Sequence, residues 1–204
     1  MTSKKGEPSG FSLVELLVVM ALIAGLIAIS IPSISALSNY KLKDEITKAA
    51  GMINEIYDTA AITGKTLRIV FDLDEQSYHA ERKLDEEEKK EIKKKEENLD
   101  KKEMDLDFAP LKGLLGKGVK LTKGVIFHGA WIEPSSEISR SGKVYLSFFP
   151  GGFTENSFIS FSFEKDEEKS MYIAISALTG EIQTGLNEPK IEDLTESAGF
   201  SNGP

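Results

Sequence analysis

The sequence predicts an α+β fold in which one long N-terminal helix precedes a domain of antiparallel strands. Apolar residues first follow a helical period and later alternate with polar residues, as in half-buried strands. Glycine, proline and acidic residues interrupt the alternating region at short intervals, as expected where antiparallel strands turn. The length of 204 residues suits one globular domain with additional segments.

The first part of the expected helix is an almost wholly apolar run over residues 13–37. As a helix it would be about 37 Å long, at roughly 1.5 Å per residue, whereas a hydrocarbon core is about 30 Å thick. We therefore predict a transmembrane helix over residues 11–37. Because Lys4 and Lys5 precede it, the positive-inside rule leaves residues 1–10 in the cytoplasm and sends the chain after Leu37 outward. In a Gram-negative cell this means an anchor in the inner membrane and a periplasmic C-terminal part.

A plain signal anchor, or a secretory signal cut near Ala36, would also fit this hydropathy. Neither explains Glu15, because a carboxylate inside a membrane helix costs roughly 2.5 to 3.5 kcal/mol on insertion scales. Such a residue suggests a positive partner. Cleavage after Gly10 would create one, since the new amino group at Phe11 lies about one helical turn from Glu15 and a neighbouring copy would carry the same amine.

The stretch "GFSLVELLVVMALIAGLIAISIP", residues 10–32, resembles the class III signal of type IV prepilins and type II secretion pseudopilins. It has a glycine before the cut, an aromatic first mature residue, a hydroxyl residue, two aliphatic residues and glutamate. The resemblance implies that prepilin peptidase cleaves after Gly10 and methylates the amino group of Phe11. It also implies that Glu15 neutralises a neighbour's terminal amine during fibre assembly, and that Pro32 kinks the helix. The Glu-Pro-Ser at residues 7–9 departs from the pattern, which often has a basic residue nearer the cut.

The apolar run continues into an amphipathic helix over residues 38–64. Apolar residues recur there at spacings of three and four, with charged residues between them, so one face should pack on a sheet. Gly64 is the expected stop. The two parts together predict one helix of about 50 residues, bent near Pro32 because proline lacks the amide hydrogen and clashes with the preceding turn.

The alternating region predicts a β-rich head over residues 65–185. Its strands are expected in "TLRIVFDLDEQSYHAE", "VKLTKGVIFHGAWIEP", "KVYLSFFPGG", "NSFISFSFE" and "MYIAISALTGEIQTG". Turns are expected at residues 74–75, 150–152, 166–168 and 179–180. An antiparallel sheet or β-sandwich follows from this order, and residues 186–204 are expected to form a polar C-terminal tail.

The order of these strands is similar to that of the minor pseudopilin H and FimT-like minor pilin group. The motifs "FFPGG" at residues 148–152 and "LTGE" at residues 178–181 are weak alone, but they follow the class III signal in the same order. The resemblance covers most of residues 10–185. It implies a type IV pilin-like ladle, with the long helix as handle and a β-sandwich as head.

The resemblance also implies a function. The chain would be a structural minor pseudopilin of the type II secretion pseudopilus, near the fibre tip, supporting protein export across the outer membrane. Its expected partners are prepilin peptidase and the major and other minor pseudopilins, and indirectly the secretion ATPase, the platform protein and the secretin. The alternative is a FimT-like minor type IV pilin acting in pilus assembly or DNA uptake.

Composition weighs against nucleic acid as a partner. The formal net charge is −8, and residues 187–204 are acidic with Lys190 as their only cation, whereas phosphate binding depends on clustered Lys and Arg. A membrane-anchored enzyme is the third class considered, and the sequence shows no set of nucleophile, acid and base that would support it.

The sequence also gives little reason to expect a metal or cofactor. The chain has no cysteine, so disulfides and thiolate sites are excluded. His79 and His128 lie far apart on expected strands, where packing or surface roles are commoner. Asp72, Asp74 and Glu75 form an acidic turn that calcium would fit, but the spacing lacks the glycine and terminal glutamate of an EF-hand loop. We expect a solvated hairpin there, with no catalytic residue, metal or cofactor.

A charged segment at residues 82–107 is expected to be an insertion between strands. Oppositely charged residues recur there at i,i+4 spacing, as in an exposed helix, for example Asp85 with Lys89 and Glu86 with Lys90. The preferred interpretation is a solvated helix or a disordered loop. A thin apolar seam of nearly heptad spacing leaves a coiled-coil contact with a neighbouring subunit as the alternative, and it consists of Leu84, Ile92, Leu99 and Leu106.

Overall fold

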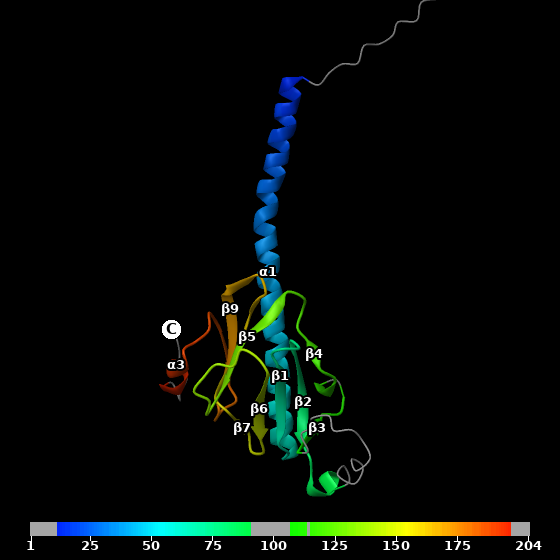
Figure 1. Ribbon diagram of the computed structural model, residues 1–204, viewed down its shortest axis with the longest axis vertical. Helices are drawn as coiled ribbons and strands as arrows, with labels where there is room; N and C mark the ends of the chain where they lie inside the picture. Colours follow the sequence, from blue (N-terminus) through cyan, green and yellow to red (C-terminus); the bar gives the residue numbers. More distant parts are fainter. Residues whose placement is uncertain (1–11, 91–106, 114, 197–204) are drawn as a thin grey trace, which may run out of the picture. The chain divides into compact units, whose positions relative to one another are not determined.

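A long helix and antiparallel strands confirm the predicted α+β class (Figure 1). The computed structural model describes residues 12–90, 107–113 and 115–196, without the side chains at 27–39, 193, 195 and 196. The chain divides into two compact units, Met1–Tyr40 and Lys41–Pro204. The second unit, called the head below, contains both sheets.

Helix α1 (Leu13–Thr63) is 51 residues long. Ser12 caps its first turn, because the Ser12 Oγ accepts a hydrogen bond from the Glu15 amide at 3.2 Å. Gly64 ends it at the predicted stop: its φ is +63°, and its amide donates to the Ala60 carbonyl at 3.0 Å. Pro32 lies among the residues whose side chains are not described, so the bend expected there remains a prediction.

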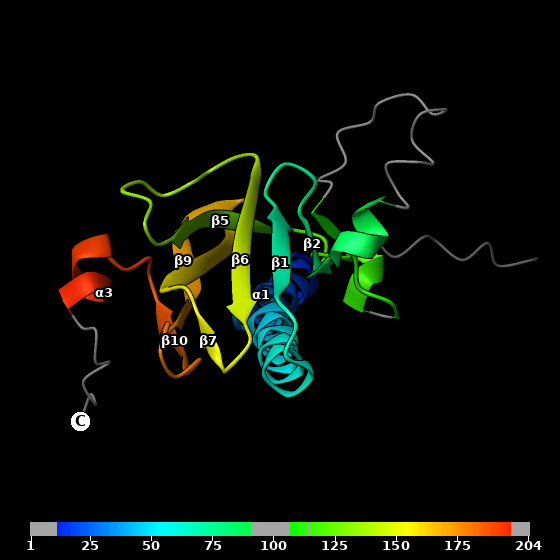
Figure 2. The same ribbon diagram turned by 90° about the horizontal axis from the view of Figure 1, so that it is seen from below.

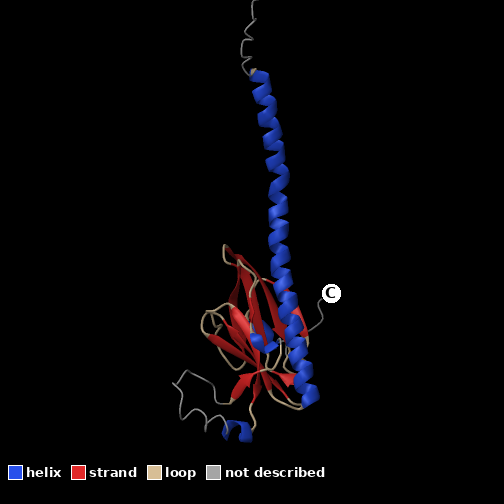
Figure 3. Ribbon diagram, turned by 90° about the vertical axis from the view of Figure 1, so that its right-hand side faces the viewer, coloured by secondary structure: helices blue, strands red, loops and turns tan. Residues whose placement is uncertain are grey.

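Within the head, α1 is amphipathic as predicted, and Figure 3 shows strands packed along this part of the helix. Its buried residues recur at spacings of three and four and are Leu42, Glu45, Ile46, Ala49, Met52, Ile53, Ile56 and Ala60. Glu45 is the polar member, and its side chain accepts hydrogen bonds from the Thr122 hydroxyl and from Lys48. Burial, with the charge of Glu45 as the next cause, raises the pKa of Tyr78 to about 12.

The first sheet has the order β3-β2-β1-β6-β7, with β4 paired to β2. Its strands are β1 (Leu67–Asp72), β2 (Ser77–Lys83), β3 (Phe108–Pro110), β4 (Val119–Lys120), β6 (Lys143–Phe149) and β7 (Phe153–Thr154), and a short 3-10 helix, η1 (Leu115–Lys117), precedes β4. The second sheet has the order β10-β9-β8-β5. Its strands are β5 (Val125–Ile132), β8 (Ser157–Phe163), β9 (Asp166–Ile175) and β10 (Ile182–Leu186).

Most predicted turns are confirmed, and one is wrong. The turn at residues 74–75 joins β1 to β2 with Asp72 opposite Ser77, and the turn at residues 150–152 joins β6 to β7. The turn expected at residues 166–168 instead lies at residues 164–165, because β9 already begins at Asp166. A register shift between Ser162 and Phe163 lets Asp166 pair with Phe163, so this acidic stretch belongs to the strand.

The main hydrophobic core lies between α1 and the two sheets, and it includes Ile53, Ile69, Phe161 and Ile173. A separate cluster lies on the opposite face of the second sheet, where helix α3 (Ile191–Glu196) covers it. Figure 2 shows α1 and α3 on opposite sides of that sheet. The predicted polar tail therefore contains a short packed helix.

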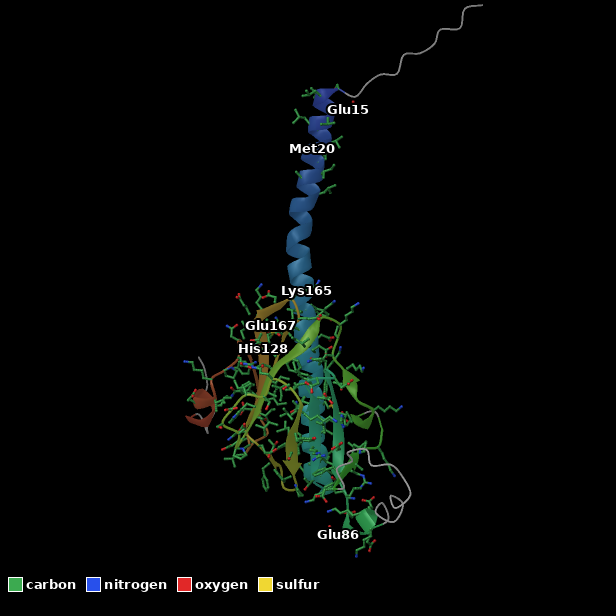
Figure 4. The ribbon with its side chains drawn as sticks, viewed as in Figure 1. Glu15, Met20, Glu86, His128, Lys165 and Glu167 are labelled. Atoms are coloured by element: carbon green, nitrogen blue, oxygen red, sulfur yellow. The ribbon has the colours of Figure 1, made fainter. Side chains whose placement is uncertain are left out.

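The charged insertion is fixed at its base, where Lys83 pairs with Phe108 and the Leu84 amide donates to the Asp107 carbonyl at 2.8 Å. The Lys89 ammonium lies 2.8 Å from the Asp107 carboxylate and 3.0 Å from Glu86, so it does not make the expected pair with Asp85. Residues 86–90 are helical, and Figure 4 labels Glu86 there.

Leu84, the first residue of the alternative coiled-coil seam, cannot contact a neighbouring subunit, because it is buried in the head with 6% of its surface exposed. The other three members, Ile92, Leu99 and Leu106, lie outside the described residues.

On the outer face of the first sheet, Arg68 lies between two aromatic rings. Its guanidinium carbon is 3.7 Å from the Phe108 ring centre and 4.5 Å from that of Tyr145. It donates to Glu81 from two nitrogens, at 2.7 and 2.6 Å, and the His79 Nε2 is 3.2 Å from the same carboxylate. This largely buried ion pair ties β1 to β2.

Acid is expected to destabilise the head through Glu81. Burial alone would raise the pKa of Glu81, but hydrogen bonds from His79 and Arg68 outweigh it and hold this pKa below its usual 4.5. The folded-state pKa is therefore below that of the unfolded chain. The stabilisation is complete above the unfolded-state pKa and is lost as the pH falls through the folded-state pKa.

Urea unfolding between about pH 7 and pH 3 tests this expectation. Glu81→Gln should cost about 2 kcal/mol at neutral pH, since it removes a hydrogen-bonded charge beside a buried arginine. Its free energy of unfolding should then fall less than that of the parent as the pH is lowered. Parallel curves for the two proteins would contradict the assignment to Glu81.

Candidate assembly site on the N-terminal helix

The predicted assembly residue, Glu15, lies in the first turn of α1 and is exposed, as Figure 4 shows. Its backbone is fixed by the Ser12 cap, because the Ser12 carbonyl accepts hydrogen bonds from the amides of Glu15 and Leu16 at 3.1 and 3.2 Å. The carboxylate is thus presented from an ordered turn. The predicted processing residues, Gly10 and Phe11, lie outside the described residues.

The helix around Glu15 exposes apolar side chains on all sides. Leu13 is 77% exposed and Leu26 67%, and every large apolar side chain between them is at least 45% exposed. Residues 16–20 are all among them, and five consecutive residues cover more than a full turn. A helix that is apolar all round requires apolar surroundings, which lipid or other helices would supply.

Glu15 is the only ionisable side chain between Phe11 and Asn39 in the sequence. An isolated carboxylate in apolar surroundings is costly unless a positive group compensates it. The chemistry offered by this segment is therefore that of an apolar contact surface with one anionic group at its start, which would select a cationic partner.

The structure describes only part of the predicted transmembrane span, residues 11–37. Within that span, side chains are described for residues 12–26. Among the residues that are described, no helix is both long and apolar enough to cross a bilayer.

In the head, the two weak sequence motifs meet at Tyr57 of α1, which was not among the predicted site residues. The Tyr57 hydroxyl of α1 donates to the Gly152 carbonyl at 2.5 Å, in the β6–β7 turn. In the β9–β10 loop, Gly180 approaches the same ring so closely that a Cβ atom there would lie 2.3 Å from it. Both glycines have positive φ, 84° and 64°. The motifs therefore join two loops to α1, which is a structural role.

The acidic turn considered for calcium is engaged in hydrogen bonds within the protein. The Asp72 carboxylate accepts from the Glu75 amide at 2.8 Å, and the Asp74 carboxylate accepts from the Gly142 amide at 3.1 Å. His128 lies on β5, away from His79 on β2. Across the described ranges, no three His, Cys, Asp or Glu side chains are grouped so that they could hold a metal ion.

No protein-family model and no curated protein sequence matches the chain. The chain is similar to two solved structures of the minor pseudopilin EpsH from the type II secretion system of Vibrio cholerae. For one, the identity is 11% and the TM-score 0.46, over 72% of this chain and 97% of that one. For the other, the values are 10% and 0.49, over 76% and 99%.

Proposed function

We propose that this chain is a structural, non-enzymatic minor pseudopilin of a type II secretion pseudopilus. The observation that carries the proposal is the N-terminal segment, in which a class III signal leads into a helix that is apolar on all sides except for Glu15. A surface of this kind is suited first to lipid and then to a bundle of similar helices. The amphipathic part of α1 packs on two sheets, and together they form the kind of head expected of such a subunit.

The proposed mechanism has three stages. Residues 11–37 first anchor the chain in the inner membrane, with the head in the periplasm. Prepilin peptidase then cleaves after Gly10 and methylates the amino group of Phe11. Finally the helix moves from lipid into the fibre core, where Glu15 pairs with the terminal amine of a neighbouring subunit and this pairing offsets the cost of burying both charges.

The proposed partners follow from this mechanism. They are prepilin peptidase and the other pseudopilins, major and minor, with the ATPase, platform protein and secretin acting indirectly. A place near the fibre tip is part of the proposal because the strand order resembles pseudopilin H. The net charge of −8 weighs against the DNA-uptake alternative.

Deleting the gene in its host tests the proposal. We expect secreted enzymes to disappear from the culture supernatant while surface pili and DNA uptake remain normal. Wild-type complementation should restore secretion. Complementation with Gly10→Asp should not, because we expect this substitution to block cleavage, and the protein should keep the mass of the unprocessed chain.

Two other outcomes would contradict parts of the proposal. Lost pili or lost DNA uptake with normal secretion would assign the chain to a type IV pilus system instead. A processed Gly10→Asp protein would show that the cut lies elsewhere.

A further inference from the structure

The second sheet ends in a strand, β10, whose outer edge is free. β10 lies at the end of the order β10-β9-β8-β5 and pairs with β9. Directly after β10, the Asn187 amide donates to the Ser170 carbonyl at 2.8 Å, so the odd-numbered residues of this stretch face β9. The backbone amides and carbonyls of Ile182, Thr184 and Leu186 therefore point away from the sheet, and they have no hydrogen-bond partner within the described part of the chain.

This edge lacks the features that usually keep other strands away. The sequence of β10 is "IQTGL", which contains neither a charged residue nor a proline, and its pairing with β9 shows no bulge. Proteins commonly protect exposed edges with such features, because the unpaired amides and carbonyls are a template for a further strand. The free edge of β10 is therefore suited to binding an extended polypeptide through its main chain.

A groove of about 510 Å³ lies beside this edge, between α1 and the second sheet. Its walls include Ala50 and Gly51 of α1, and Met171 and Thr184 of the sheet. The two α1 residues leave room, since nothing lies within 4 Å of a Cβ atom added at Gly51. Leu186 is on the same face of β10 as Thr184 and is 73% exposed. A strand added at the edge would thus place alternate side chains in an open, partly apolar groove.

The groove carries opposite charges at its two ends. The close approach of Gly180 to Tyr57 fixes one end, at the start of β10, where Asp58 and Glu181 are exposed. Lys43 lines the other end, and within the described residues it makes no ion pair. From Lys43 to Asp58, α1 rises roughly 22 Å, which is the length of about seven residues in a strand.

We propose that the free edge of β10 docks an extended segment of a partner protein, about seven residues long, as an added antiparallel strand. The antiparallel direction follows from the sheet itself, in which every neighbouring pair is antiparallel. The segment then begins near Lys43 and ends near Asp58 and Glu181, so its first residue is acidic and its last is basic. The inference stands apart from the secretion proposal, because it depends only on contacts within the head.

Hydrogen exchange of the full chain in detergent, followed by NMR, tests the docking. The probe is a peptide with capped ends and the sequence Glu-Val-Thr-Val-Thr-Val-Lys. With this peptide bound, the amides of Ile182, Thr184 and Leu186 should exchange at least tenfold more slowly, because they gain partners. The amides of Gln183 and Gly185 already face β9 and should change little.

Two controls test the role of charge. A peptide of reversed sequence, with lysine first and glutamate last, has the same composition and should bind about tenfold more weakly. Lys43→Glu should weaken binding of the first peptide by a similar factor. Lys112→Glu, which changes an exposed lysine in the loop after β3 of the first sheet, should bind like the parent.

Three results would overturn the proposal. The first is unchanged exchange of the three edge amides at millimolar peptide, and the second is equal binding of the two peptides. The third is protection that appears without peptide as the protein concentration rises, because a second copy of the chain would then occupy the edge.

Discussion

Gly180→Ala is expected to destabilise the head by about 4 kcal/mol. The added Cβ atom would lie 2.3 Å from the Tyr57 ring, and overpacking of this kind costs about 1–3 kcal/mol. An L side chain at a φ of +64° adds about 1–2 kcal/mol. The ring cannot move away freely, because its hydroxyl is bound to the Gly152 carbonyl. Thermal unfolding of the full chain should shift down by about 10 °C.

Two other glycines separate the causes of this effect. Gly124 also has a positive φ, +89°, but nothing lies within 4 Å of its added Cβ, so Gly124→Ala should show the backbone cost alone. Gly51 lies inside α1 with open space around it, and Gly51→Ala should stabilise the protein by about 1 kcal/mol. If Gly180→Ala and Gly124→Ala cost the same, contact with the Tyr57 ring does not limit this loop.

Under the proposed pseudopilin function, Glu15→Gln is expected to reduce incorporation into the fibre about 100-fold while membrane insertion stays normal. A carboxylate in lipid costs roughly 2.5 to 3.5 kcal/mol, and pairing with an amine in the fibre would remove that cost. The neutral amide of the variant would gain no such pairing energy on moving from lipid into the fibre. Since about 1.4 kcal/mol corresponds to a factor of ten, the change in partition is about two orders of magnitude. Crosslinking to neighbouring subunits in the cell measures it.

Glu55→Gln is the matched control, because it removes an exposed carboxylate from the same helix, in the head rather than in the apolar segment. It should crosslink like the parent. Equal crosslinking of the Glu15→Gln and parent proteins would show that the carboxylate does not drive assembly, and membrane fractionation would confirm that both variants still insert.

Helix α1 and most strands could be predicted because each follows a local rule. The spacing of apolar residues after Leu42 and the glycine at residue 64 were enough to place the second half of α1 and its end. The alternation of apolar and polar residues on either side of Asp72 and Ser77 predicted the hairpin of β1 and β2. In both cases one face of the element is buried, so apolar residues recur with the period of the helix or of the strand, and this period can be seen in the sequence.

The features that could not be predicted depend on partners distant in sequence. Tyr57 looked like one more member of an amphipathic stripe, and nothing local indicates that two loops close on it. Glu45 occupies a core position where Thr122 and Lys48 both bind its Oε1, and neither partner is evident from the sequence. α3 was missed because a six-residue helix with two aliphatic contacts has too little periodicity to stand out from a polar tail.

Glu15 stood out in the sequence because it is a charged residue within an apolar run, and the structure places it at the capped start of α1. Its role in assembly stays a prediction. The cleavage and methylation expected at Gly10 and Phe11 remain predictions. They depend on recognition by another protein, which no intramolecular contact reveals.

The fixed base of the charged insertion has a consequence for how freely its length can vary. The ends of the insertion are already held together by the Leu84–Asp107 hydrogen bond and by the Lys89–Asp107 ion pair. Because these contacts are made by residues on either side of 91–106, the pairing of β2 with β3 does not depend on how many residues lie between them. An epitope tag placed within residues 91–106 is therefore expected to leave both sheets intact.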